Sequence, residues 1–319
     1  MKENRKEKRR AQSRAAGHTC SPEMDGESME EQLNVKRNAD TAAETGEEAA
    51  EEAKRIEGAE GERYACERVT PEEYRETHVV DIFDAGPAGE VKLSVLFRIC
   101  QNVCFNHLEK LGLGYMRLRE DGMVFLIISN RAEISRMPRY GEKLEILTYP
   151  RGSAGVTFYR GFEVFSGGER LVKMMQSSAL VNPEDHKLLR PKDFYAYGIF
   201  KETKTPKEDK ISRISPEKGE TVLPMPLLGE RAIRYSDLDC NRHMNNTIYA
   251  DVLEDFLPGG HEGRSYACVQ VDYVSEALLG ETIALRGEEK DGVCILQGFH
   301  ERGLSFSARA EMKKIIGNS

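Results

Sequence analysis

The sequence lacks several features that identify common protein classes. No part of its 319 residues approaches the ~20 consecutive apolar residues of a membrane-spanning helix, so no membrane span is expected. Its seven cysteines, at positions 20, 66, 100, 104, 240, 268 and 294, have no spacing typical of a zinc site or a disulfide framework. The cysteine pattern therefore predicts a reduced, cytoplasmic protein.

The sequence also lacks the loops on which several enzyme classes depend. It contains no Gly-x-Ser-x-Gly elbow and no Walker loop, and Gly112-Leu-Gly114 has no third glycine to complete a dinucleotide-binding fingerprint. His243 has no second histidine nearby with which to hold a metal ion. We therefore expect neither a cofactor nor a metal.

Charge is concentrated at the start of the chain. Residues 1–21 carry seven Lys or Arg and two Glu, whereas residues 22–62 carry fourteen acidic and four basic residues. Residues 1–64 contain almost no aromatic or branched apolar side chains, so they cannot bury enough surface to offset the entropy of ordering. We predict a disordered, charged tail. Its basic start is interpreted as a solvated extension, so no nucleic-acid partner is expected, and its many Glu argue against an organelle transit peptide.

Beyond residue 64 the sequence repeats one order of elements. The first copy has an extended run at 78–83 and a helix whose apolar stripe begins at Leu93 and ends before Gly112. Strand-like stretches separated by Gly-rich turns follow at 123–134, 143–148, 157–165 and 171–181. Because the helix is apolar on much of its circumference, we expect a sheet to curl around it.

The second copy contains the same order in fewer residues. A strand is predicted at 230–235, and a helix follows in which Tyr249, Val252, Leu253 and Phe256 share one face. Further strands are predicted at 266–274, 282–286, 293–300 and 304–313. The sequence Tyr-Gly-Glu-Lys-Leu-Glu-Ile at 140–146 also resembles Leu-Gly-Glu-Thr-Ile-Ala-Leu at 279–285, which supports a duplication.

This pattern predicts an α+β protein with two domains of one kind, each an antiparallel sheet wrapped around a central helix. We assign residues 65–200 to the first domain and residues 222–319 to the second. Residues 201–221 join them and are polar and Lys-rich, which predicts an exposed linker.

The second copy carries a polar cluster that the first copy lacks. Asp239, Asn241 and His243 are spaced two apart, so an extended backbone would project them to one side and Cys240 to the other. The corresponding stretch of the first copy, 83–91, contains no His or Asn. A turn in which these side chains only satisfy backbone groups is the alternative interpretation.

The run Ser-Asp-Leu-Asp-Cys-Asn-Arg-His-Met-Asn-Asn at 236–246, followed by Tyr249, resembles the signature of the acyl-acyl carrier protein thioesterases, which are tandem double hot-dog proteins. Val-Asp-Tyr-Val-Ser-Glu-Ala at 271–277 is similar to the family strand that ends in a catalytic Glu. The resemblance implies that Asp239, Asn241, His243 and Glu276 form the catalytic site. Plant members commonly have Cys directly after that Glu, and Ala277 here excludes a cysteine nucleophile at this position.

The resemblance also implies roles for these residues. Glu276 is expected to act as general base, Asn241 and His243 to position water and the thioester carbonyl, and Asp239 to orient the others. Backbone N–H groups near Asn245 and Asn246 are expected to complete the oxyanion site. First-copy residues are expected to line the acyl pocket, among them Phe97, Gln101, Phe105 and Leu108.

We therefore expect a hydrolase that cleaves fatty acyl thioesters from acyl carrier protein. An acyl-CoA or aromatic-thioester hydrolase, and a non-catalytic acyl-binding hot-dog protein, are the alternatives. The expected partner is acyl carrier protein, and a homodimer is left open.

Overall fold

The computed structural model describes residues 66–214 and 225–315. The predicted tail at 1–64 and part of the predicted linker lie outside the described residues. Within the described part, no helix is both long and apolar enough to cross a membrane.

The first half of the structure contains one long helix and six strands, with two short helices and a 3-10 turn beside them. These elements are β1 (Cys66–Val69), β2 (Tyr74–Val79), α2 (Leu93–Lys110), α3 (Tyr115–Glu120), β3 (Val124–Ile134), β4 (Lys143–Ala154), β5 (Thr157–Ser166), β6 (Glu169–Val181), α4 (Pro191–Tyr195) and η1 (Lys207–Asp209). The predicted strand at 78–83 is wrong at its C-terminal end, because β2 ends at Val79. Residues 81–84 turn instead, with the Asp81 side chain accepting from the Phe83 N–H.

The second half repeats this order around a shorter helix. Its elements are β7 (Leu227–Ala232), the 3-10 turn η2 (Tyr235–Asp237), α5 (Ile248–Asp255), β8 (Arg264–Tyr273), β9 (Thr282–Lys290), β10 (Val293–His300) and β11 (Gly303–Lys314). Both predicted helices and the predicted strands of the second half are confirmed to within a few residues at most ends.

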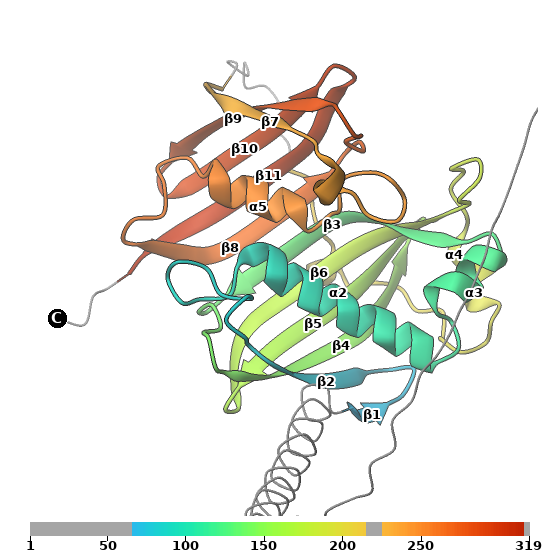
Figure 1. Cartoon of the computed structure of the whole chain (residues 1–319). Helices are drawn as coiled ribbons and strands as arrows, with labels where there is room; N and C mark the ends of the chain where they lie inside the picture. Colours follow the sequence, from blue (N-terminus) through green and yellow to red (C-terminus); the bar gives the residue numbers. More distant parts are fainter. Residues whose placement is uncertain (1–65, 215–224, 316–319) are drawn as a thin grey trace, which may run out of the picture. The chain divides into compact units, whose positions relative to one another are not determined.

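All eleven described strands form one antiparallel sheet, in the order β1-β2-β4-β5-β6-β3-β8-β11-β10-β9-β7. The two halves join where β3 pairs with β8, from Ser129 opposite Asp272 to Glu133 opposite Cys268. Helices α2 and α5 lie against the same face of this sheet and contact each other (Figure 1). The two predicted sheets are therefore halves of one continuous sheet.

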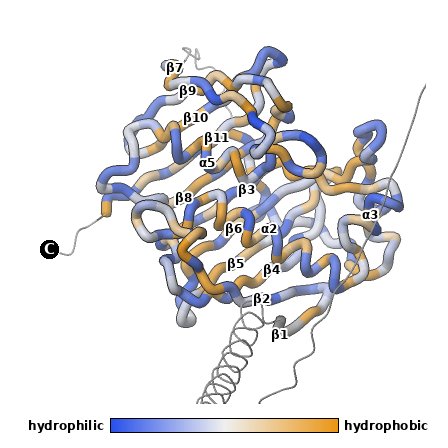
Figure 2. The backbone as a smooth tube through the Cα atoms, viewed as in Figure 1, coloured by the Kyte–Doolittle hydropathy of each residue, from blue (hydrophilic) through white to orange (hydrophobic). Residues whose placement is uncertain are grey.

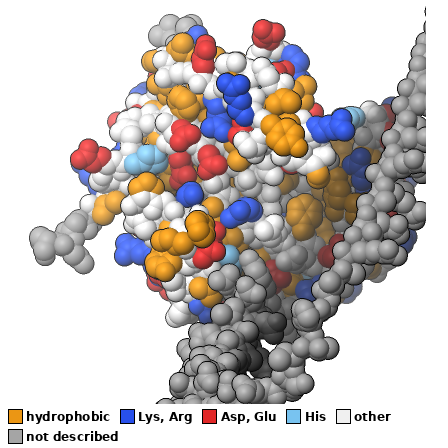
Figure 3. All heavy atoms as spheres, viewed as in Figure 1, with side chains coloured by type: hydrophobic (Ala, Val, Ile, Leu, Met, Phe, Trp, Pro, Cys, Tyr) orange, Lys and Arg blue, Asp and Glu red, His pale blue; other side chains and the backbone are white. Residues whose placement is uncertain are grey.

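The burial pattern explains why the helices occupy that face. Hydrophobic and hydrophilic stretches are interleaved along the strands (Figure 2), and β10 alternates buried and half-buried residues along its whole length. On α2 the buried residues cover most of the circumference: Leu93, Ser94, Val95, Leu96, Phe97, Ile99, Cys100, Val103, His107 and Leu108. The helix is enclosed as its sequence predicts. On the face shown in Figure 3, acidic and basic side chains are interspersed.

The duplication is visible in matched backbone hydrogen bonds. The Val80 N–H donates to the Glu142 carbonyl at 2.9 Å, and the Ile233 N–H donates to the Glu281 carbonyl at 2.8 Å. In return, Gly141 donates to Val80 and Gly280 donates to Ile233. Equal geometry at both places shows that the two halves have the same local fold.

Most of the linker residues in 201–214 are exposed, as its composition predicts, but two of them are buried. Thr205 and Asp209 are buried, and Asp209 pairs with the Arg151 guanidinium. Further along, the Ile214 N–H donates to the buried carboxylate of Asp272 at 2.7 Å. Parts of the linker therefore pack against β4 and β8, where Asp209 pairs with Arg151 and the Ile214 N–H with Asp272.

Candidate active site

The polar cluster lies on a tight turn and not on an extended segment. Leu238 and Met244 form an isolated antiparallel bridge, and between them Asp239 N–H donates to the His243 carbonyl at 3.0 Å. Arg242 has a positive φ of 69°, and the Asp239 side chain accepts from the Asn241 N–H at 2.8 Å. The predicted alternation of faces is wrong, because Asp and Asn favour turns in which they bond nearby backbone groups.

The first half contains the same turn with different side chains. Gly86 N–H donates to the Glu90 carbonyl at 2.8 Å, and Gly89 has a positive φ of 70°, which matches Arg242. Gly86 thus stands where Asp239 stands in the second half, and Glu90 stands where His243 stands. The first half keeps the backbone of the turn without its amide and imidazole groups.

The turn places His243 between two carboxylates. Its Nδ1 lies 3.6 Å from Asp239 Oδ2, and its Nε2 lies 3.8 Å from Glu276 Oε1. The backbone explains this convergence, because His243 bridges to Leu278 and the Met244 N–H donates to the Ala277 carbonyl at 2.9 Å. Asn241 belongs to the same group, since its side-chain oxygen accepts from the Tyr115 hydroxyl at 2.9 Å.

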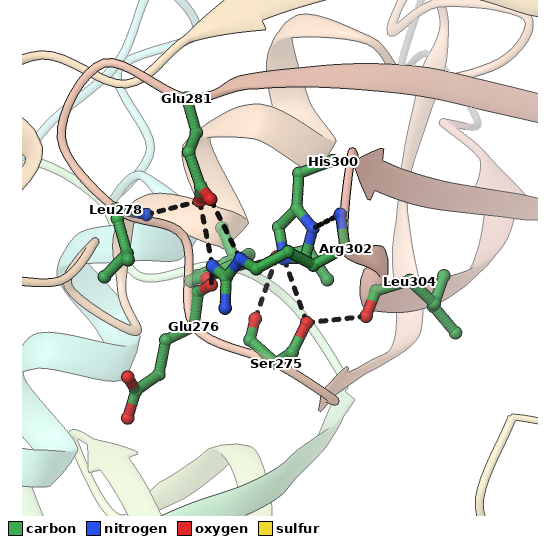
Figure 4. A network of polar contacts seen from close by, with 9 residues as sticks. Ser275, Glu276, Leu278, Glu281, His300, Arg302 and Leu304 are labelled. Atoms are coloured by element: carbon green, nitrogen blue, oxygen red, sulfur yellow. Dashed lines mark hydrogen bonds and ion pairs between the residues drawn. The ribbon is translucent and has the colours of Figure 1, made fainter.

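Glu276 sits on a segment that a separate polar network holds in place (Figure 4). Arg302 donates to the Glu276 carbonyl at 2.6 Å and pairs with the Glu281 carboxylate, which in turn accepts from the Leu278 N–H at 2.8 Å. The hydrogen bond from Arg302 lowers the pKa of Glu281. These contacts use the main chain of Glu276, and its carboxylate points away from the network (Figure 4).

Ser275 and His300 are in contact, but their hydrogen bonds are not those of a serine nucleophile and its general base. His300 Nδ1 accepts from the Arg302 N–H at 3.2 Å, so a neutral ring carries its proton on Nε2. That Nε2 lies 3.0 Å from Ser275 Oγ, whose own proton goes to the Leu304 carbonyl at 2.8 Å. In this tautomer His300 donates to Ser275 and cannot take its proton, which assigns the pair a positioning role.

A cavity of about 1040 Å³ opens from the polar cluster into the first half. Its lining includes Asp239, Asn241, His243 and Glu276, together with Asn245 and Asn246, which precede α5. Phe125, Phe158 and Phe194 form part of the wall and pack edge to face at 5.1 to 5.6 Å between ring centres. The cavity is polar at the cluster and largely aromatic or aliphatic beyond it.

Three of the four predicted acyl-pocket residues line this cavity, namely Gln101, Phe105 and Leu108. The prediction for Phe97 is wrong, because its side chain is completely buried in the main core and does not reach the cavity. It lies one helical turn before Gln101, on the part of α2 that packs into the core. Cys240 also differs from its prediction as a packing residue, since it is exposed and lines the cavity.

The two asparagines before α5 have different backbone environments. The Asn245 N–H donates to the Asp237 carbonyl at 2.9 Å, and the Asn245 side chain accepts from the Thr247 N–H at 2.9 Å. For the Asn246 N–H, no acceptor is found among the described residues. Asn246 is therefore the member of this pair with a backbone donor left for a ligand.

A buried polar row that the sequence does not reveal supports the turn. Gln176 donates to Asn130 at 3.0 Å, Asn130 donates to the Tyr273 hydroxyl at 3.2 Å, and that hydroxyl donates to the Asn246 carbonyl at 3.0 Å. Burial raises the pKa of Tyr273, which keeps the hydroxyl protonated as a donor. These residues come from β6, β3 and β8, so only the register of the sheet brings them together.

Arg160 enters the cavity wall beside a buried histidine. Its Nη1 lies 3.0 Å from His107 Nδ1, and His107 Nε2 lies 2.7 Å from the Thr70 carbonyl. Burial, and secondly the charge of Arg160, lowers the pKa of His107 to about 4. His107 is thus a neutral core residue. Over the described residues, no group of three or more His, Cys, Asp or Glu side chains is arranged to hold a metal.

Two family models match the chain. The acyl-ACP thioesterase N-terminal domain matches residues 71–197, and the acyl-ACP thioesterase C-terminal domain matches residues 228–311. Both matched ranges fall inside the two domains that the sequence predicts.

The chain is also similar to curated plant proteins. It is 19% identical over 222 residues to the dodecanoyl-[acyl-carrier-protein] hydrolase, chloroplastic, of Cinnamomum camphora, covering 66% of this chain and 58% of that one. It is 22% identical over 199 residues to the oleoyl-acyl carrier protein thioesterase 2, chloroplastic, of Arabidopsis thaliana, covering 58% and 54%. The chain thus spans about half the length of the curated relatives it matches.

Solved structures share the fold at similarly low identity. An acyl-ACP thioesterase from Bacteroides thetaiotaomicron superposes with a TM-score of 0.66 at 20% identity, over 76% of this chain and 98% of that chain. The 12:0-ACP thioesterase from Umbellularia californica gives 0.65 at 18% identity, over 76% and 97%. This likeness shows the double hot-dog arrangement that the sequence predicts.

Proposed function

Because the chain belongs to the acyl-ACP thioesterase family, we propose that it hydrolyses fatty acyl thioesters of acyl carrier protein to free fatty acid and the carrier thiol. One observation carries this proposal: His243 lies between the carboxylates of Asp239 and Glu276 at the polar end of an otherwise mainly apolar cavity. A cavity of about 1040 Å³ is large enough for a long flexible chain, since ligand pockets commonly measure ~300–1,000 Å³.

The geometry supports a water-based mechanism. Glu276 takes a proton from a water molecule that attacks the thioester carbonyl carbon, and the carbonyl π electrons move onto oxygen. The tetrahedral oxyanion then collapses to the fatty acid and expels the thiolate, which receives the proton held by Glu276 and leaves as the carrier thiol. His243 positions the water and substrate, and Asp239 holds the imidazole in orientation through the Nδ1 side.

Asn241 and its partners fix the approach to the carbonyl. The Tyr115 hydroxyl donates to Asn241, and Arg119 donates to the Tyr115 hydroxyl at 3.0 Å. These hydrogen bonds occupy the side-chain oxygen of Asn241 and leave its amide nitrogen available to donate to a ligand. We propose that this nitrogen donates a hydrogen bond to the attacking water or to the thioester oxygen.

The surroundings of the cavity favour an acidic carrier over a small thioester. Arg119, Lys201 and Arg242 line the cavity and are exposed, so they are available to the phosphopantetheine arm and to carboxylates of a carrier protein. The carrier contribution is expected to weaken as salt concentration rises, because exposed charges are screened over about 8–10 Å at physiological ionic strength.

A substrate panel tests the proposal and separates it from the alternatives. The full chain is assayed with one acyl group attached to acyl carrier protein, to CoA and to an aromatic thiol, at two salt concentrations. A higher kcat/KM on the carrier protein, falling with salt, supports the proposal. Equal rates on CoA would indicate a general acyl-CoA hydrolase, and acyl binding without turnover of any thioester would indicate a non-catalytic acyl-binding protein.

We also propose that the protein is cytoplasmic and that it forms a homodimer. The curated relatives are described as chloroplastic, so fluorescence localisation of the tagged full chain in its host is the direct test of compartment. Light scattering of the purified chain tests the dimer. A mass of one chain would overturn it.

A further inference from the structure

The two helices are related by the duplication, residue by residue. The Lys92 N–H donates to the Asp84 carbonyl at 3.0 Å, and the Asn245 N–H donates to the Asp237 carbonyl at 2.9 Å, so Lys92 and Asn245 are equivalent. One residue further along the chain, Leu93 at the start of α2 is then equivalent to Asn246, which lies just before α5. In the same way Gln101 on α2 is equivalent to Glu254 on α5.

At the start of α2, a carboxylate from the opposite helix closes the backbone. Glu254 Oε1 accepts from the Leu93 N–H at 3.2 Å. Burial raises the pKa of Glu254 to about 7, and the hydrogen bond from Leu93 partly opposes this shift. The Leu93 N–H, which has no acceptor within its own helix, is therefore satisfied by a side chain of the protein itself.

At the start of α5, the equivalent pair is left open. The Asn246 N–H has no acceptor among the described residues. Gln101, the counterpart of Glu254, carries a buried Nε2 without any hydrogen-bond partner, one of only four such side-chain atoms in the described part of the chain. Both residues line the cavity that contains His243 and Glu276.

A buried amide nitrogen without a partner costs free energy, so such groups are rare unless a ligand satisfies them. Here the two unpaired N–H donors, of Gln101 and Asn246, line one cavity. The equivalent groups at the start of α2, Glu254 and Leu93, are hydrogen-bonded to each other. Because these equivalent groups meet in a hydrogen bond, we expect the two unpaired donors to reach one oxygen, and two donors suit an oxygen that gains negative charge.

We propose that Gln101 is a catalytic residue whose Nε2, together with the Asn246 N–H, binds the carbonyl oxygen of the thioester. This inference rests on the proposed thioester hydrolysis. As water adds to the carbonyl carbon, the two donors stabilise the charge that develops on the oxygen. When the C–S bond breaks and the carbonyl re-forms, the oxygen is neutral again. The same assignment explains why the first half has no second site: Glu254 occupies the position that a substrate oxygen would need.

The first test replaces Gln101 with a side chain of similar length that cannot donate. Gln101→Met is expected to lower kcat by about 10²–10³, the usual effect of removing one oxyanion donor, with little change in the affinity for free fatty acid. Asn102→Leu is the matched control, because it removes an amide from the next position of α2, which is exposed and outside the cavity. Its rate is expected to equal that of the wild type.

A second variant keeps the test decisive if Gln101→Met unfolds. Gln101→Glu places an acceptor where a donor is required, so it is expected to be strongly impaired at high pH. Its rate relative to the wild type is expected to recover as the pH falls and the new carboxyl becomes protonated and can donate. A purely structural role for Gln101 would give a ratio that does not change with pH.

A spectroscopic readout completes the experiment. The carbonyl stretch of a bound acyl ketone, in which CH2 replaces the thioester sulfur, is expected at lower frequency in the wild type than in Gln101→Met. Wild-type rates in Gln101→Met, or the same stretch in both proteins, would overturn the assignment. If the wild type itself hydrolyses no thioester, the proposed function fails instead, and the two failures are distinguishable.

Discussion

The Nε2 atom of His243 lies 3.8 Å from a carboxylate oxygen of Glu276, although the two residues belong to a turn and to the loop that follows the distant strand β8. Two backbone contacts cause this approach: the bridge from His243 to Leu278 and the hydrogen bond from Met244 to Ala277. The distance exceeds that of a direct hydrogen bond and leaves the two side chains free to share a water molecule.

The first prediction follows from that relationship. Glu276→Gln and His243→Ala are each expected to reduce kcat on acyl carrier protein thioesters by about 10²–10⁴, because each removes a group that moves or positions a proton. Steady-state kinetics measures the effect, and circular dichroism confirms the fold. Glu288→Gln and His261→Ala are matched controls, since these exposed residues lie outside the cavity. Wild-type rates in both site variants would contradict the assignment.

The second prediction concerns Tyr115, which no sequence pattern identifies. Tyr115→Phe removes the donor to Asn241 and frees the Asn241 side chain to rotate. The loss of one ordinary hydrogen bond predicts a roughly three- to tenfold lower kcat with little change in KM. The control is Tyr140→Phe at an exposed position, where the ring is 59% accessible. An unchanged kcat in Tyr115→Phe would show that Asn241 is held by its own turn alone.

The contrast between Asn241 and Tyr115 shows what the sequence could and could not predict. Asp239, Asn241 and His243 are close in sequence, and a local motif predicts that they act together. Tyr115 lies 126 positions from Asn241, and their contact depends on the folding of two halves onto one sheet. No local pattern contains that information.

The errors of the sequence analysis have equally specific causes. Alternation along a strand placed Cys240 away from the site, but the Asp239 side chain bonds the backbone and turns the chain. The apolar pattern of α2 could not separate Phe97 from Phe105, because it does not show that Phe97 is buried in the core while Phe105 is half exposed and lines the cavity. The helix limits were predictable, since they depend on local apolar spacing and on glycine.

The third prediction uses the wall of the cavity. Ser178 on β6 lines the cavity and is not a core residue, so a larger side chain there fills open space without displacing the core. Ser178→Leu is expected to shift the preferred acyl length toward shorter chains, with a lower kcat/KM on long ones. Ser178→Ala is the matched control, because it removes the hydroxyl without filling space. An unchanged chain-length profile for Ser178→Leu would show that the acyl chain does not occupy this part of the cavity.

The fourth prediction concerns stability and returns to Glu254, the residue that closes the start of α2. Its folded-state pKa of about 7 is above the value of 4.5 expected in the unfolded chain, so between these values the folded protein binds more protons. The contribution of Glu254 to stability is therefore fully present below pH 4.5 and is lost as the pH rises through 7, in total roughly 3 kcal/mol.

Glu254→Gln keeps an oxygen that accepts from the Leu93 N–H but cannot ionise, so this loss of stability should disappear in the variant. Urea unfolding at pH 5 and pH 8 measures it, with Glu288→Gln at an exposed position as the charge-matched control. If Glu254→Gln loses as much stability as the wild type over this range, the pKa of Glu254 is not raised on folding, and other groups cause the loss.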